Sequence, residues 1–423
     1  MIFHLYVFIF QSISCNAQIQ PFPGDVIRGI NYYIGDNSST SALSTLQSVQ
    51  NHAVSTGATL LAISFQICQS SPNSNYVFRD PAITPSNESI ITLINFASEL
   101  GMSTFLKPLV LQNGSDSSFA MADVNPSNNT LWFESYSKVM LEFAELSENV
   151  DVSMICVGLE LEQVSSSNTA EWISLIQKIR QVYSGKLSYC SDTLSGETEA
   201  IQFWSELDYI GLDIYVPLVN SFDPHPDLQP PLSSMQAEFD YIWNVGFYDW
   251  YASSPWINVI PLFITETGYP SSNGGLQTPY EIPSASKGGC TGIYSENQTV
   301  QVAALEVLST QLRSYMINEQ IVGMVYFNFD DRSNSWYQNK TNGTFACSWS
   351  PVDKSGYVAL RELFSSPNSI PASIPTVIKW NSSANANSTV VSYGDASIPM
   401  QIALSVCGLV GAVGVFLWTA CRQ

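Results

Sequence analysis

The segment MICVGLE, from Met154 to Glu160, is an apolar run that ends in a carboxylate. The segment PLFITETGY, from Pro261 to Tyr269, repeats this pattern around Glu266. Runs that are apolar throughout are typical of parallel strands buried on both faces. A charged side chain at the end of such a run is costly unless it is paired, solvated by a cleft or used. The two segments therefore predict strands of a parallel sheet whose ends carry functional acids.

Six further β-rich runs share the chain with these two, at a spacing of roughly 40 residues, with longer amphipathic runs between them. The expected strands are 27–32, 59–64, 103–109, 153–160, 186–190, 209–215, 259–266 and 323–329. One helical face is marked by Ile90, Leu93, Ile94 and Ala97, closed by Gly101, and another by Trp132, Tyr136, Val139, Met140 and Phe143. Eight such units predict a (β/α)8 TIM barrel, a single catalytic domain over residues 18–365. A doubly wound sheet would need a Gly-rich phosphate-binding turn after its first strand, and Arg28 to Tyr32, RGINY, is not one.

Both ends of the chain differ from this pattern. Residues 1–17 read as a secretory signal peptide, with an apolar run from Leu5 to Phe10. Ser, Asn and Pro dominate residues 366–397, which we interpret as a glycosylated stalk. The tail, 398–423, is uncharged from Met400 to Ala420, long enough for the roughly 30 Å of a bilayer core. It is either a GPI-attachment signal or one transmembrane helix, so we expect an extracellular protein anchored to the outer face of the plasma membrane.

Glycosylation sequons agree with an exterior location. The expected sites are Asn37, Asn87, Asn113, Asn128, Asn297, Asn339, Asn342, Asn381 and Asn387.

The composition excludes several other classes of protein. The chain has 423 residues, of which 36 are acidic and 15 basic, for a formal charge of -21. So little positive charge excludes a nucleic-acid partner. An apolar content of 45%, with 12% aromatic residues, supports a large core rather than disorder. We expect a monomer.

The cysteines and histidines offer little to a metal site or to nucleophilic catalysis. Cys290 and Cys347 are the expected disulfide because both lie in Gly/Ser/Asn-rich loops after successive late strands. Cys156 and Cys190 lie in apolar runs, where buried thiols are expected. With no CxxC and only three histidines, of which His225 lies in a predicted loop, a zinc site or Ser-His-Asp triad has few candidate residues.

The fourth and seventh strands of an eight-stranded barrel face each other across its mouth, so their terminal glutamates can form a pair. Glycoside hydrolysis needs such a pair, and a separation near 5 to 5.5 Å implies retention through a covalent intermediate. In this interpretation Glu160 is the general acid/base and Glu266 the nucleophile. Glu162 is a rival for the acid role because it shares a face with Glu160, but it lies further out, in an expected loop. The mechanism implies no metal or organic cofactor.

Three motifs in barrel order carry a resemblance to a known family. They are Trp132-Phe133-Glu134-Ser135-Tyr136 through Cys156-Val157-Gly158-Leu159-Glu160-Leu161, then Phe203 to Tyr215, FWSELDYIGLDIY, and Phe263 to Tyr269, FITETGY. Over roughly residues 26–365 the chain resembles glycoside hydrolase family 113, the β-mannanase-like TIM barrels. The resemblance implies a retaining endo-acting hydrolase of β-1,4-linked mannose polymers, with the acid/base at Glu160 and the nucleophile at Glu266.

Some positions depart from the family. Leu159 precedes the acid/base where a polar residue is usual, Leu109 replaces a frequent His, and the eighth strand ends in Tyr326-Phe327-Asn328-Phe329-Asp330 rather than in Trp-rich sequence. These departures bear on sugar specificity rather than on the catalytic pair.

Other expected site residues bind substrate or support the pair. By analogy with the family, Tyr215 donates a hydrogen bond to Glu266, or else is an interfacial tyrosine at the rim. Asn31 and Lys107 end strands and hold sugar hydroxyls or anchor loops. Phe329 and Trp336 supply an aromatic platform for a sugar ring or pack in the core. The segment 270–296, rich in Gly, Ser and Pro, is expected to form a cleft wall.

Two functions follow from these expectations. The first is a glycosidase at the cell surface that cleaves an oligo- or polysaccharide. The second is a catalytically inactive carbohydrate-binding or adhesion protein on the same scaffold, favoured by the altered cleft positions. The presence of both glutamates favours the enzyme.

Overall fold

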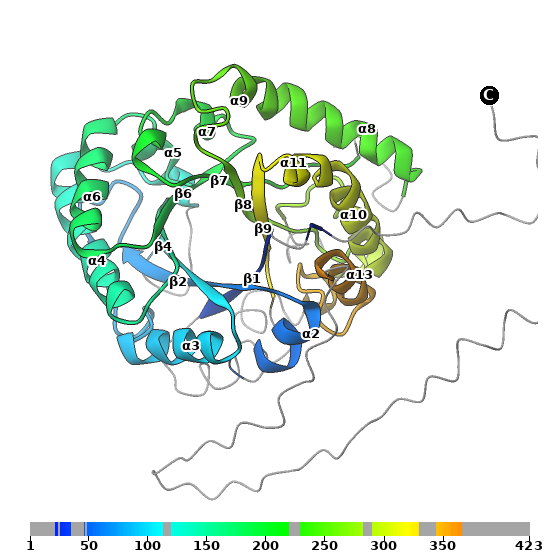
Figure 1. Cartoon of the computed structure of the whole chain (residues 1–423), viewed down its shortest axis with the longest axis horizontal. Coiled ribbons are helices and arrows are strands. Elements are labelled where there is room, and N and C mark those ends of the chain that lie inside the picture. Colours follow the sequence, from blue (N-terminus) through cyan, green and yellow to red (C-terminus); the bar gives the residue numbers. More distant parts are fainter. Residues whose placement is uncertain are drawn as a thin grey trace, which may run out of the picture. The chain divides into compact units, whose positions relative to one another are not determined.

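The computed structural model describes residues 22–23, 26–34, 46, 49–112, 120–219, 229–281, 290–329 and 344–365. Within these residues, eight parallel strands close into a barrel surrounded by helices (Figure 1). The barrel strands are β1 (Ile27–Ile34), β2 (Leu60–Gln69), β4 (Ser103–Gln112), β5 (Met154–Leu159), β6 (Lys186–Asp192), β7 (Tyr209–Asp213), β8 (Leu262–Thr267) and β9 (Ile321–Tyr326). The barrel closes because β1 pairs in parallel with both β2 and β9. The predicted TIM barrel is confirmed.

Helices connect successive strands around the outside of the barrel (Figure 1). The main ones are α3 (Asn87–Glu99), α4 (Asn129–Asn149), α6 (Thr169–Val182), α8 (Leu232–Trp243), α10 (Gln298–Gln311) and α13 (Ser355–Phe364). Shorter α-helices are α2 (Val54–Thr56), α5 (Glu162–Ser165), α7 (Glu197–Ala200), α9 (Asp249–Ser253) and α11 (Arg313–Ile317). Single turns are η1 (Val49–Ala53), η2 (Met121–Asp123), η3 (Trp204–Glu206), η4 (Asn244–Tyr248), η6 (Gly292–Tyr294) and η7 (Thr344–Cys347).

The strand residues form two separate cores because successive side chains point to opposite faces. Alternate residues such as Phe105, Met154 and Cys156 fill the barrel interior. Their neighbours, such as Leu106 and Ile155, pack outward against the helices. Both faces are therefore dry, which explains why the strands read as continuous apolar runs.

The predicted helical faces are buried as expected. Ile90, Leu93, Ile94 and Ala97 are the buried face of α3. The Ser86 side chain caps the helix by accepting a hydrogen bond from the backbone N–H of Ser89. Gly101, just beyond the helix, has a φ of 73°, a left-handed conformation that glycine adopts at little cost. The five predicted residues of α4 are all buried.

Several strand boundaries differ from prediction. The strand expected from Val259 begins at Leu262, and Val259 is exposed in the preceding turn. The last barrel strand ends at Tyr326, so Phe329 lies in the following loop. A short strand, β3 (Val77–Phe78), was not predicted and pairs antiparallel with the end of β2.

Some predictions fall outside the described residues. These are the signal peptide, the stalk, the hydrophobic tail, Trp336, His225 and the sequons at Asn37, Asn113, Asn339, Asn342, Asn381 and Asn387. Among the residues that the structure describes, no helix is both long enough and apolar enough to span a bilayer.

The three described sequons differ in their surroundings. Asn87 and Asn128 are exposed. Asn297 is half-buried, and its Nδ2 donates to Asn273 Oδ1 at 2.8 Å. A glycan on Asn297 would replace a hydrogen of that amide nitrogen and compete with this bond.

Candidate active site

One cleft opens where the carboxyl ends of the strands meet. It has a volume of about 390 Å³ and is lined by Glu160, Asp192, Leu194, Ser195, Tyr215, Glu266, Tyr280, Phe327 and Trp349. Both glutamates singled out in the sequence therefore lie in one cavity. This end of the barrel is where the loops after the parallel strands converge.

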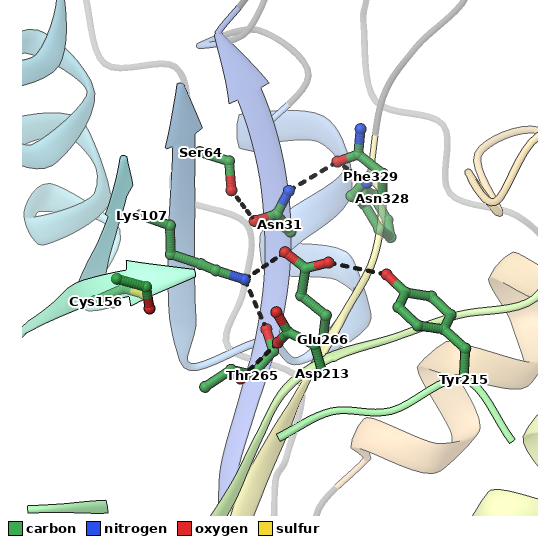
Figure 2. A network of polar contacts seen from close by, with 11 residues as sticks. Asn31, Ser64, Lys107, Cys156, Asp213, Tyr215, Thr265, Glu266, Asn328 and Phe329 are labelled. Atoms are coloured by element: carbon green, nitrogen blue, oxygen red, sulfur yellow. Dashed lines mark hydrogen bonds and ion pairs between the residues drawn. The ribbon is translucent and has the colours of Figure 1, made fainter. Parts of the chain in front are cut away.

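Glu266 lies in β8 and is held by two side chains, one from β4 and one from the segment after β7 (Figure 2). Lys107 Nζ donates to its Oε1 at 2.5 Å, and the Tyr215 hydroxyl donates to its Oε2 at 2.9 Å. Only 6% of the Glu266 surface is exposed. With both oxygens engaged, the carboxylate is fixed in position and directed at the cleft.

Lys107 is fully buried in β4 and also donates to the Thr265 carbonyl oxygen at 3.0 Å. Burial alone would lower the pKa of Lys107, but the negative charges of Glu266 and Asp213 outweigh that effect and raise it. The Lys107 ammonium therefore stays charged at acidic, neutral and mildly alkaline pH. It contacts the glutamate, not solvent, so the expectation that Lys107 holds sugar hydroxyls is corrected to a bond with Glu266.

Tyr215 follows β7 and lines the cleft. Burial, and then the charge of Glu266, raise the pKa of Tyr215 well above its ordinary value. The neutral phenol is thus maintained as a donor, in the position that the family resemblance implied.

Glu160 follows the last residue of β5 and has a φ of 48°, a left-handed conformation uncommon for a residue with a Cβ. Such a conformation costs roughly 1–2 kcal/mol and persists only where the surroundings impose it. Its backbone N–H donates to the Cys190 carbonyl oxygen at 2.9 Å, across a bulge in the β5–β6 pairing. Burial raises the pKa of Glu160 well above its usual range, and the charges of Asp213 and Glu266 raise it further. These are the conditions for a carboxyl group that keeps its proton.

Glu162, the rival for the acid role, is the first residue of α5 and is not among the cleft-lining residues. The left-handed turn at Glu160 separates the two side chains, so they do not share a strand face as the sequence spacing alone implied.

Asp213 is a third carboxyl group that sequence reasoning missed. It is 1% exposed, and its Oδ1 accepts a hydrogen bond from Thr265 Oγ1 at 2.6 Å. One oxygen each from Glu160, Asp213 and Glu266 lie within 4.8 Å of one another. Burial and the Glu266 charge raise the pKa of Asp213 well above its usual range. Asp213 precedes Tyr215 by two residues, a spacing that places both on the inner face and was the available signal.

The three carboxyl groups are of a kind that can bind a cation, but the protein supplies one of its own. Lys107 is bonded to Glu266 and acts electrostatically on Asp213. One ammonium balances one carboxylate, so the cluster favours an ionised Glu266 beside protonated Glu160 and Asp213.

Two predicted substrate contacts are wrong, because the side chains are buried away from the cleft. Asn31 is fully buried, accepts from Ser64 Oγ at 2.6 Å and donates to Asn328 Oδ1 at 3.0 Å (Figure 2). It therefore anchors the loop after β9 to β1. Phe329 is also fully buried and packs against Tyr32 and Tyr357, so the packing alternative is the correct one.

The aromatic surface of the cleft comes instead from Tyr280, Phe327 and Trp349. Tyr280 is 54% exposed and lies in the Gly/Ser/Pro-rich segment predicted as a cleft wall. Trp349 Nε1 donates to the Pro279 carbonyl oxygen at 2.7 Å and so fixes that wall. A disulfide joins Cys290 to Cys347, between the same wall and the segment carrying Trp349. Cys156 and Cys190 are free, buried thiols.

Solved structures of similar fold agree with this architecture. A complex of a GH113 beta-1,4-mannanase has a TM-score of 0.59 at 19% identity, over 80% of this chain and 99% of its own. The GH113 β-mannanase AaManA from Alicyclobacillus acidocaldarius, in complex with ManMIm, has a TM-score of 0.58 at 18% identity, over 80% and 97% of the two chains. At this identity the likeness establishes the fold. No curated protein sequence matches the chain.

The sequence pattern described as Glycoside Hydrolase Family 113 matches residues 29–292, more than half of the 423 residues and including both cleft glutamates. The chain belongs to glycoside hydrolase family 113.

Proposed function

We propose that this protein hydrolyses β-1,4-linked mannan or a related β-linked polysaccharide, with retention of configuration, by a double displacement on Glu160 and Glu266. The observation that carries the proposal is the difference between these two carboxyl groups within one cleft. Glu266 is bonded to a buried ammonium, whereas Glu160 is surrounded by acids that favour its protonated form. Their oxygens approach within 4.8 Å, which suits direct attack rather than an intervening water.

In the first step, Glu266 attacks the anomeric carbon as Glu160 transfers its proton to the glycosidic oxygen. The bond to the leaving sugar breaks, and a glycosyl ester forms on Glu266. Lys107 and Tyr215 hold the two oxygens of Glu266, so the attacking group is oriented before substrate arrives.

In the second step, the ionised Glu160 removes a proton from water, and the water oxygen attacks the same carbon. The ester bond breaks, Glu266 is released as a carboxylate, and Glu160 regains its proton. Because Glu160 must begin protonated, activity falls on the alkaline side as it ionises.

The substrate class rests on the family and on the cleft. The two similar structures described above are β-mannanases by name. The cleft offers aromatic faces to a sugar ring from Tyr280, Phe327 and Trp349. We further propose that the protein acts outside the cell, as a monomer anchored to the membrane by its C-terminal tail, on the sequence features described above.

The test is reducing-sugar release by the full-length protein from β-1,4-mannan, glucomannan, cellulose, xylan and laminarin, beside Glu160→Ala and Glu266→Ala. Release from mannan that both substitutions abolish supports the proposal, and NMR of the first-formed anomer tests retention. Binding that survives both substitutions, without release from any polymer, would instead support the carbohydrate-binding alternative.

A further inference from the structure

Glu197 is a buried carboxylate that the proposed mechanism does not use. It begins α7, is 3% exposed, and accepts three hydrogen bonds. The Tyr189 hydroxyl and Ser165 Oγ donate to its Oε1 at 2.6 and 2.7 Å, and the Asp192 backbone N–H donates to its Oε2 at 2.8 Å. Because a buried carboxylate is costly, so complete a set of donors indicates a specific role.

The first of these bonds leads to the acid/base. The backbone N–H of Leu161, the residue after Glu160, donates to the Tyr189 hydroxyl at 2.8 Å, and that hydroxyl donates onward to Glu197. Tyr189 is fully buried, so water does not replace this link. Ser165, the second donor, ends the short helix α5 that follows the Glu160 turn. Through Tyr189 and Ser165, Glu197 therefore holds the segment that directly follows Glu160.

The third bond leads to the cleft wall after β6. Glu197 holds the Asp192 N–H, and Asp192 Oδ1 accepts from the Leu194 N–H at 3.1 Å. Ser195 Oγ donates to the Asp192 carbonyl oxygen at 3.1 Å and accepts from the Glu197 N–H at 3.3 Å. Asp192, Leu194 and Ser195 line the cleft beside Glu160. One carboxylate thus ties together the acid/base turn and the adjacent wall.

We propose that Glu197 is a positioning residue for acid catalysis, acting through Tyr189 to hold Glu160 in its left-handed conformation and through Asp192 to fix the wall beside it. This inference deepens the proposed function and rests on Glu160 being the acid/base. Glu160 needs such support because its φ of 48° is not self-maintaining.

The first test is Tyr189→Phe, which removes the hydroxyl link but retains the ring packed against Trp172 and Phe203. The matched control is Tyr136→Phe. Tyr136 is equally buried and packs on the same Trp172. Its hydroxyl donates to the Val157 carbonyl oxygen of β5, the strand that leads to Glu160, at 2.9 Å, and does not contact Glu197. Amide hydrogen exchange at Leu161 is expected to accelerate at least tenfold in Tyr189→Phe and to stay unchanged in Tyr136→Phe. Unchanged protection of Leu161 in Tyr189→Phe would overturn the proposal.

The second test is the dependence of kcat/KM on the leaving group, measured with aryl β-manno-oligosides. Poor leaving groups need a proton from Glu160, whereas dinitrophenolate does not. Tyr189→Phe is expected to lose about 10- to 100-fold on the phenyl glycoside and less than twofold on the dinitrophenyl glycoside. An equal loss on both substrates, or the same pattern in Tyr136→Phe, would show a merely structural role.

Glu197→Gln keeps the shape and supplies an independent measurement if Tyr189→Phe folds poorly. The ionisable groups near Glu197 are Tyr189 and Asp192 on β6 and Glu162 on α5, and those near Glu160 are Asp192, Glu197, Asp213 and Glu266. Removal of the Glu197 charge lowers the pKa of Glu160, so the alkaline limb of kcat/KM moves to lower pH. An unmoved limb together with unchanged exchange at Leu161 in Glu197→Gln would contradict the proposal.

Failure of the proposal and failure of the proposed function give different results. If the unmodified protein turns over no glycoside, the assignment as a hydrolase of these sugars fails, while Leu161 exchange still decides whether Glu197 and Tyr189 hold the turn. If the unmodified protein cleaves these glycosides and the Tyr189→Phe and Glu197→Gln variants behave like it, only the positioning role of Glu197 fails.

Discussion

The two glutamates of the proposed mechanism are held in different ways. The Glu266 carboxylate is gripped directly, with Lys107 on one oxygen and Tyr215 on the other. The Glu160 side chain makes no hydrogen bond within the described part of the chain, and only the backbone around it is fixed. A nucleophile needs one oriented charge, whereas an acid/base must lose and regain a proton, which strong permanent bonds to its charged form would oppose. The difference in support therefore matches the difference in role.

The largest expected effect comes from replacing either glutamate, and its size depends on the leaving group of the substrate. Glu266→Ala eliminates the ester-forming group and is expected to lower kcat by about 10⁴-fold or more on mannan and on a dinitrophenyl glycoside alike. Glu160→Ala is expected to lose about 10²–10⁴-fold in kcat/KM on mannan but little on the dinitrophenyl glycoside, whose leaving group needs no proton. If each variant lost the same factor on mannan as on the dinitrophenyl glycoside, Glu160 and Glu266 would not have the different roles proposed for them. Initial-rate kinetics on the two substrates are the measurement.

The next effect comes from breaking the direct grip on Glu266. Lys107→Met leaves a buried carboxylate without its cation, which is expected to cost about 3–5 kcal/mol of unfolding free energy. Urea unfolding measures this loss, and kcat/KM is expected to fall about 100-fold or more because the nucleophile loses its orientation. Lys186→Met is the matched control. Lys186 pairs with Asp208 at 2.9 Å on the exposed surface, where an ion pair contributes at most about 1 kcal/mol. Equal losses in the two variants would contradict the role of Lys107.

A smaller effect concerns the indirect support of Glu160. Burial raises the pKa of Glu197 to about 7. A raised pKa in the folded state favours folding fully below the unfolded value, near pH 4.3, and that contribution is lost as the pH rises through 7. The loss amounts to at most about 4 kcal/mol, from 1.36 kcal/mol per pH unit. Urea unfolding at pH 4 and pH 8 should show this loss in the unmodified protein and a smaller one in Glu197→Gln. Identical pH dependence in both proteins would argue against a buried, titrating Glu197.

The smallest effect concerns Asp213, the third carboxyl group, which lies near both Glu160 and Glu266. Asp213→Asn removes a carboxyl group whose negative charge, once it ionises, raises the pKa of Glu160, so the alkaline limb of kcat/KM is expected to move to lower pH. The maximal kcat should change by less than about tenfold because the amide resembles the protonated acid in shape. Thr265→Val removes the hydroxyl bonded to Asp213 but keeps the carboxyl group, so it should move the limb less than Asp213→Asn does. A pH profile is sufficient to distinguish these outcomes.

The parts of the fold that follow from strand periodicity could be predicted from the sequence. The runs ending at Glu160 and Glu266 are dry on both faces, and that requirement makes their sequences recognisable. The strand that carries Lys107 was predicted, but β4 runs on to Gln112, so Lys107 lies in its middle and not at its end. Its partner Glu266 was not predicted, because only the closed barrel brings β4 and β8 within reach of each other.

Other features depend on backbone geometry that composition does not encode. Phe329 was assigned to a strand that ends at Tyr326, so its direction into the core was lost. No glycine in the sequence indicates the left-handed turn at Glu160. After this turn, Glu162 is not among the residues that line the cleft. The support comes from Glu197, the first residue of α7 and 37 residues further along the chain, beyond the reach of any local pattern.

The lining of the cleft also determines which polymers enter it. Its described side chains include Glu160, Asp192 and Glu266 and no basic residue, and the chain as a whole carries a formal charge of -21. Because Glu160 favours its protonated form and Glu266 is paired with Lys107, the negative potential in the cavity comes mainly from Asp192 and the acidic surface around it. We expect polysaccharides rich in uronate or sulfate to be repelled at the barrel mouth, most strongly at low ionic strength. The acidic cleft and surface are thus expected to act as an electrostatic filter that favours neutral glycans over anionic ones.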